Sequence, residues 1–165
     1  MYNDPIVEKY INTIKASCKE IRTFFQGDPL KIPASSLPCC IISRVATQSG
    51  FLDSANDEHN MTLHITVVTD IRSELSTEEN VSKIAPGVAK LYDIIEGRNA
   101  DYTLKDSSIL KIIRTNQPID LAHNLRTDLH TQTRVDYGTT MRNRNPAEWS
   151  IEATVEVVSN FIQLR

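Results

Sequence analysis

Two stretches of the chain alternate between apolar and polar residues, which is the pattern of a β-strand with one buried face. In 60–70 the apolar positions are Met61, Leu63, Ile65 and Val67, and between them lie Thr62, His64 and Thr66. In 149–165 they are Ile151, Ala153, Val155 and Val157, and between them lie Glu152, Thr154 and Glu156. Residues 39–48 are rich in Ile, Val and Thr and predict a third strand, and Val135 and Tyr137 mark a fourth. The loop around 49–60 is too short for a helical crossover, so we expect the strands on either side of it to be antiparallel neighbours.

Apolar residues at three- and four-residue steps predict an amphipathic helix near the amino terminus. Its stripe consists of Val7, Tyr10, Ile11, Ile14, Cys18 and Ile21. Asp4 followed by Pro5 is a helix start, because aspartate accepts hydrogen bonds from the first amides and proline needs no donor there. Residues 21–25 are consistent either with the end of this helix or with a short strand.

A second helix is predicted to begin at Ser76 or Thr77, where glutamates meet the positive end of the helix dipole. Its apolar stripe is Val81, Ile84, Ala85, Val88, Leu91, Tyr92 and Ile95. Pro86 and Gly87 predict a kink or break near residue 84, and Gly97 predicts a left-handed cap at the end. A short third helix, with Ile109, Leu110, Ile112 and Ile113, is predicted to follow a cap at Asp106 or Ser107.

Three segments fit neither period: the proline-rich arm 28–38, the polar stretch 115–131 and the turn 142–149. The stretch 115–131 is either an extended arm or a weak edge strand. The order helix, strands, helices, strands predicts an α+β fold in which two to three helices flank an antiparallel or mixed central sheet. With 165 residues and no linker or internal repeat, the chain is expected to form one domain, 1–165.

Composition narrows the class of protein. The chain is 40% hydrophobic and 24% charged, which is typical of a globular domain and not of a disordered one. Its formal net charge of −3 disfavours a sequence-independent grip on DNA, because such binding neutralises phosphates. We expect no secretory signal and no membrane span, and the odd number of cysteines, 3, predicts free thiols in a reducing compartment.

Few residues could act in catalysis or bind a metal, and their spacing does not match the known motifs. Cys39 and Cys40 are adjacent, so in a strand they point to opposite faces, and we expect one core cysteine and one half-exposed cysteine. His59, His64, His123 and His130 lack the spacing of zinc ligands. Nucleophile-elbow and phosphate-loop motifs are absent from the sequence. These patterns predict no catalytic residue, no cofactor and no metal, although a small monomeric enzyme or ligand-binding domain using His64 and the cysteines stays as an alternative.

Features that suit contact with other proteins are more informative. Phe51, Leu52 and Asp53 place apolar side chains in a loop that should face water. A turn with Arg142 and Arg144 precedes Trp149, which is the single tryptophan, and arginines and aromatic residues are enriched at interfaces. We predict these six residues as a subunit or partner interface. The alternative is that Phe51 and Trp149 fold back onto their own domain.

The segment AKLYDIIEGRNADYTLKDSSILKIIR, which ends at Arg114, resembles the tail-terminator proteins of tailed bacteriophages. In that family a helix with an E-G-R-like end leads to a short helix containing D-[ST]-[ILV] and then an arginine. Other parts of the chain also fit: Phe24-Phe25, the K-I-P-x-S-S-L-P arm, the acidic turn before Thr62, and the final alternating strand. The resemblance therefore extends over most of the chain.

This resemblance implies a structural virion protein whose copies form a hexameric ring. The ring would cap the tail tube at the phage neck. The ring would join the tail tube protein to the head-closure or connector protein after assembly in the host cytoplasm. DNA would pass through the lumen without specific binding, and an acidic balance suits that role because it repels phosphate. Another neck or head-closure component is the alternative within the same class.

Overall fold

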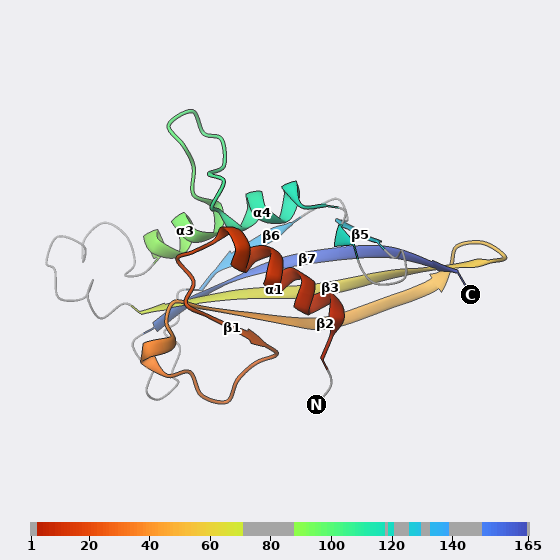
Figure 1. The fold of residues 1–165 in the computed structure, drawn as a ribbon, viewed down its shortest axis with the longest axis horizontal. Helices are drawn as coiled ribbons and strands as arrows, with labels where there is room; N and C mark the ends of the chain where they lie inside the picture. The colour runs from red at the N-terminus through yellow and green to blue at the C-terminus, as the bar shows by residue number, and fades with distance from the viewer. Residues whose placement is uncertain are drawn as a thin grey trace, which may run out of the picture.

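The structure is a computed structural model, and it describes residues 3–70, 88–117, 119–120, 126–129, 133–138 and 150–164. Along the chain the elements are α1 (Pro5–Ser17), β1 (Thr23–Gln26), the 3₁₀ turn η1 (Ala34–Ser36), β2 (Cys39–Phe51), β3 (Asn56–Asp70), α3 (Val88–Glu96), α4 (Ile109–Thr115), β4 (Ile119–Asp120), β5 (Arg126–Leu129), β6 (Arg134–Tyr137) and β7 (Ser150–Leu164). The seven strands form one sheet in the order β1-β2-β3-β7-β5-β4, and β6 also pairs with β7. Because β1 is parallel to β2 and the other pairs are antiparallel, the sheet is mixed. The predicted α+β class is confirmed (Figure 1).

Helix α1 begins where the sequence predicts. The Asp4 carboxylate accepts hydrogen bonds from the amides of Ile6 and Val7, and Pro5 occupies the first turn. The helix ends at Ser17, so Cys18 and Ile21 are buried beyond its end rather than on its stripe. The alternative of a short strand after the helix is the correct one, because Thr23–Gln26 pairs with β2.

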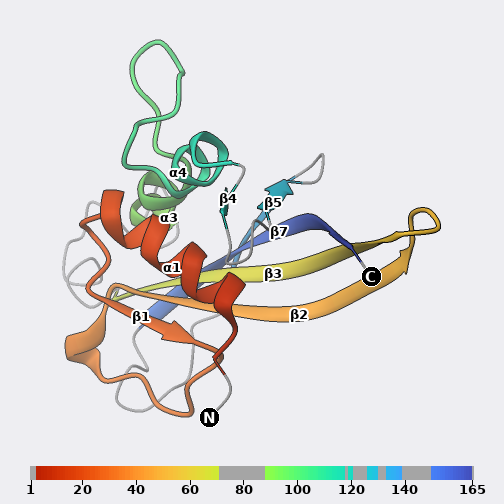
Figure 2. The same ribbon diagram turned by 45° about the vertical axis from the view of Figure 1, so that its right-hand side comes forward.

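The main core lies between the sheet and the layer of α1, α3 and α4 (Figure 2). All apolar positions of the two alternating strands are buried there: Met61, Leu63, Ile65, Val67, Ile151, Ala153, Val155 and Val157. The hydroxyl of Tyr10 in α1 contacts that of Ser159 in β7, so this buried tyrosine has a polar partner. The predicted alternation of both strands is confirmed.

A second, smaller cluster lies on the other side of the sheet. It consists of Ile32, Leu37, Cys39, Ile41 and Val68. Ile32 is 0% exposed and Leu37 is 5% exposed, so the arm 28–38 is anchored to its own sheet. The irregular arm thus has a small core of its own, formed with apolar residues of β2 and β3 that are distant in sequence.

The ends of the α-helical segments differ from two expectations. Gly97 does not adopt a left-handed conformation; a Cβ there would lie 2.4 Å from the carbonyl oxygen of Asp93, so close approach is what requires glycine. The cap of α4 is Ser108, whose hydroxyl accepts from the Lys111 amide, and not Asp106 or Ser107. No described helix has the length and apolar character to cross a bilayer.

The polar stretch 115–131 contains the short strands β4 and β5, as the edge-strand alternative expected. β6 forms where Val135 and Tyr137 predict it, and both side chains pack on the main core. The predicted helix start near Ser76, the kink at Pro86 and the turn 142–149 lie outside the described residues.

Replacing Gly97 with alanine should destabilise the fold by about 1–3 kcal/mol, because the new methyl group overlaps backbone atoms that cannot move freely. Gly50→Ala is the matched control, since a Cβ at Gly50 meets nothing within 4 Å. Urea unfolding of both variants checks this. Equal stability of the two variants would contradict the close approach at Gly97.

Candidate functional site

The β2–β3 hairpin continues well past the helical layer and forms a projecting ribbon (Figures 1 and 2). We call Arg44–Thr62, together with the part of β7 paired to it, the ribbon. Every β2 residue from Arg44 to Phe51 is exposed, on both faces of the sheet. The expectation of a loop at 49–60 is wrong, because the ladder joins Phe51 to Asp57 and leaves only a short turn at the tip.

The ribbon leaves the body at a β-bulge. The register of β2 against β3 shifts between Arg44 and Ala46, which inserts Val45 as an extra residue. Arg44 is fixed at this point by an ion pair with Asp4, at 2.7 Å between Nη2 and Oδ2. The base of the ribbon is therefore tied to the amino-terminal cap of α1.

Contacts between its own strands hold the ribbon together. On the helix side, the rings of His59 and Phe161 stack at 4.7 Å between centroids, and His59 Nδ1 lies 2.7 Å from Ser49 Oγ. On the other side, Asn160 donates to Glu58 and Asn60. These cross-strand contacts make the ribbon a formed structure rather than a loose loop.

The tip turn is organised by Asp53. Its carboxylate accepts hydrogen bonds from the amides of Ala55 and Asn56 and from the Asn56 side chain. These hydrogen bonds, the Asn56 side chain first, hold the pKa of Asp53 below its usual value of 3.8. Asp53 was predicted as an interface residue, and its observed contacts are those of a turn residue.

The two apolar residues of the predicted interface are open to solvent. Phe51 is 82% exposed and Leu52 is 47% exposed. The alternative in which Phe51 folds back onto its own domain is therefore wrong. Arg142, Arg144 and Trp149, the other half of the predicted interface, lie outside the described residues, as do His123 and His130.

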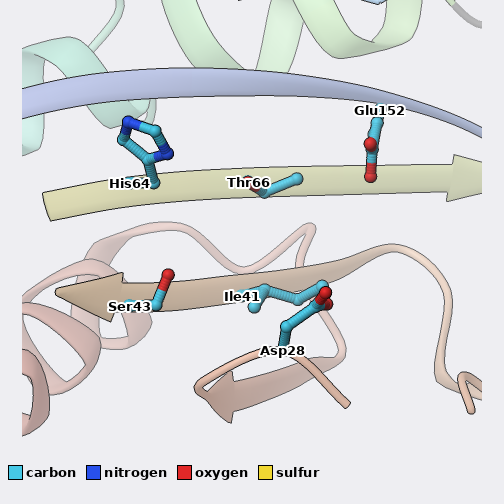
Figure 3. A pocket seen from close by; sticks show the side chains of 6 residues that line it. All are labelled: Asp28, Ile41, Ser43, His64, Thr66 and Glu152. Atoms are coloured by element: carbon cyan, nitrogen blue, oxygen red, sulfur yellow. The ribbon is translucent and has the colours of Figure 1, made fainter. Parts of the chain in front are cut away.

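A shallow pocket of about 220 Å³ lies on the face of the sheet opposite the helices (Figure 3). It is lined by Asp28, Ile41, Ser43, His64, Thr66 and Glu152. His64 Nε2 pairs with Glu156 at 3.2 Å, but among the described contacts Ser43 makes no hydrogen bond with the imidazole. A serine that no base contacts is not an activated nucleophile. Among the described residues, no group of three or more metal-ligating side chains converges.

None of the three cysteines is among the residues that line this pocket. Cys40 is in the main core and Cys39 in the second cluster, so the adjacent thiols do point to opposite faces. Both are 0% exposed, and the expectation of one half-exposed cysteine is wrong because the arm 28–38 covers Cys39. Since Cys40 and His64 lie on opposite faces of the sheet, the pocket does not combine the imidazole with that thiol.

No protein-family profile matches the sequence, and no curated protein matches it significantly.

Burial should protect the three thiols from alkylation. Burial raises the pKa of the Cys18 thiol and raises that of Cys40 well above its usual value, so the reactive thiolate is scarce in the native state. Native protein should react with a thiol reagent at least about tenfold more slowly than unfolded protein. An Ala16→Cys variant supplies an exposed thiol as a positive control. Rapid native labelling of Cys39 or Cys40 would contradict the assigned burial.

The tip turn should lose order in acid. Because the folded pKa of Asp53 is lowered, its contribution is complete above 3.8 and is lost as the pH falls through the lowered value. Amide shifts of Ala55 and Asn56, followed by NMR, should change with a midpoint below 3.8, and Asp53→Asn should remove the change. A midpoint at or above the ordinary aspartate pKa would contradict the turn.

Proposed function

We propose that the protein is a ring-forming tail terminator of a tailed bacteriophage. In this role its copies cap the tail tube and join it to the head-closure protein at the neck. The proposal rests on the resemblance of the segment ending at Arg114 and on the form of the ribbon. Its alternative within the same class is another neck or head-closure component, which would use the same surfaces.

The main support for the proposal is the exposure of the ribbon. Along Arg44–Phe51 a long strand contributes no buried side chain to its own subunit, and it ends in exposed Phe51 and Leu52. A fold gains little stability from such a projection, because burial of apolar surface is the main favourable term. Contact with another subunit gives these residues the burial that their own domain does not.

Charge on the ribbon fits a part that lies near passing DNA. The stretch Arg44–Thr62 contains Asp53, Asp57 and Glu58, and its single lysine or arginine is Arg44, which lies at the base and pairs with Asp4. An acidic surface does not attract phosphates, so DNA would pass without being held. Charge of this kind also disfavours a role as a nucleic-acid-binding module.

Replacing Phe51 with aspartate should impair assembly and leave folding intact, because the side chain is exposed in the single subunit. Loss of one buried aromatic contact should raise the concentration needed for ring formation by about tenfold or more. Light scattering gives the mass, negative-stain images show the ring, and thermal unfolding reports the fold.

Leu30→Asp is the matched control, since Leu30 is 98% exposed but lies in the arm after β1 and not on the ribbon. Rings are expected from the wild type and from Leu30→Asp. Rings formed equally well by Phe51→Asp, or a wild type that neither forms rings nor joins purified tails, would reject the proposed role of the ribbon.

A further inference from the structure

In the part of the chain that the structure describes, no strand covers the outer edge of β2 along the ribbon. β1 pairs with β2 only from Cys39 to Ile42, and no other described strand lies along this edge. The Leu52 amide donates to the Asn56 carbonyl across the turn. Since backbone groups alternate along an antiparallel ladder, Gly50 and Gln48 also face β3, whereas Ser49 and Thr47 direct their backbone groups outward.

This edge lacks the usual protection against pairing. Exposed edge strands normally carry charges or proline, because an unprotected edge pairs with any available strand. The stretch Val45–Phe51 contains no charged residue and no proline. The bulge at Val45 is a protective feature, but it lies at the base of the ribbon rather than along it.

We propose that two copies of this chain pair antiparallel along their β2 edges, with a two-fold axis at Gln48. The sequence of the edge is self-complementary about that residue. In this register Gln48 faces Gln48 of the second copy, Thr47 faces Ser49, Ala46 faces Gly50, and Val45 faces Phe51. Hydroxyl residues thus face hydroxyl residues, small residues face small ones, and apolar residues face apolar ones. The edge is therefore complementary to itself, as an isologous interface requires.

The outward backbone groups suit this register. Thr47 and Ser49 of opposite copies become hydrogen-bonded pairs and exchange about four N–H···O bonds in all. Gln48, whose backbone groups face β3, becomes the non-hydrogen-bonded pair on the axis. The residues whose backbone groups point away from β3 are therefore the same residues that this register joins by hydrogen bonds.

The length of the open edge also suits this register. Pairing extends from Val45 to Phe51, and the next pair is Leu52 with Arg44 of the second copy. The strand β2 of each copy ends at Phe51, so the paired strands stop three positions before Ile42, where β1 of the other copy ends.

This inference goes beyond the proposed function. In a ring with purely cyclic symmetry no two-fold axis relates neighbouring subunits, so edge pairing about such an axis is the contact of the protein before it joins a ring. The dimer and the ring differ in mass and symmetry, and each can therefore fail without the other.

Charged substitutions at Gln48, the residue that faces itself across the two-fold axis, test the pairing. Gln48→Glu and Gln48→Lys each put like charges face to face, so each variant alone should be a monomer, with a dimer Kd raised about tenfold or more. An equal mixture of the two should recover the dimer, because glutamate then faces lysine. Sedimentation at matched concentrations measures all three, and Ala16→Glu, an exposed change on α1, should remain dimeric like the wild type.

Thr47→Pro tests the backbone independently. It removes an outward donor while leaving the β3 ladder intact, and it should yield a folded monomer, whereas Thr47→Val should stay dimeric.

A monomeric wild type at the highest soluble concentration would overturn the inference. Gln48→Glu and Gln48→Lys that remain dimeric alone, or that fail to pair when mixed, would overturn it as well. Rings that form from a wild type without a dimer would reject this inference and leave the proposed function standing.

Discussion

The antiparallel ladder between β3 and β7 is the interaction on which the other parts of the structure depend. It continues without a shift in register from Asn56 opposite Leu164 to Asp70 opposite Ser150. Strands of this length extend about 50 Å, at roughly 3.4 Å per residue. Such a span exceeds what three short helices cover. The end of the ladder near Asp70 and Ser150 packs under the helices and forms the core, and the end near Asn56 and Leu164 belongs to the ribbon.

The change from core to ribbon can be followed in the side chains. Between Met61 and Val67 every second residue is buried under the helices, and the strand is stabilised by apolar burial. Before Met61 the strand is half-buried and polar, and cross-strand contacts such as Ser49 with His59 replace the core. Because the hydrogen-bonded ladder is continuous, the body holds the ribbon in place, and the Arg44–Asp4 ion pair fixes its base. The proposed contact between copies thus uses an edge that is rigid before any partner arrives.

Local patterns predicted the parts of the fold that depend on local physics. Asp4-Pro5 located the start of α1, and the alternation after Met61 located a core strand with its buried face. Parts determined by distant contacts were not predictable. Ile32 in the arm 28–38 is buried by strands that the arm's own sequence does not indicate. Exposed Phe51 was identified correctly as unusual, but it was placed in a loop, because a strand exposed on both faces has no apolar period to reveal it. The absence of charged residues from Val45 to Gly50 is the sequence feature that could have indicated this strand.

The most direct measurement is amide hydrogen exchange, resolved by residue with NMR, at low and high protein concentration. The amides of Gln48 and Gly50 face β3 and serve as internal references, because their protection depends only on the fold. Protection of the Thr47 and Ser49 amides should rise with concentration while that of the two references stays constant. Exchange of Thr47 and Ser49 that is equally fast at every concentration would contradict pairing of this edge between copies.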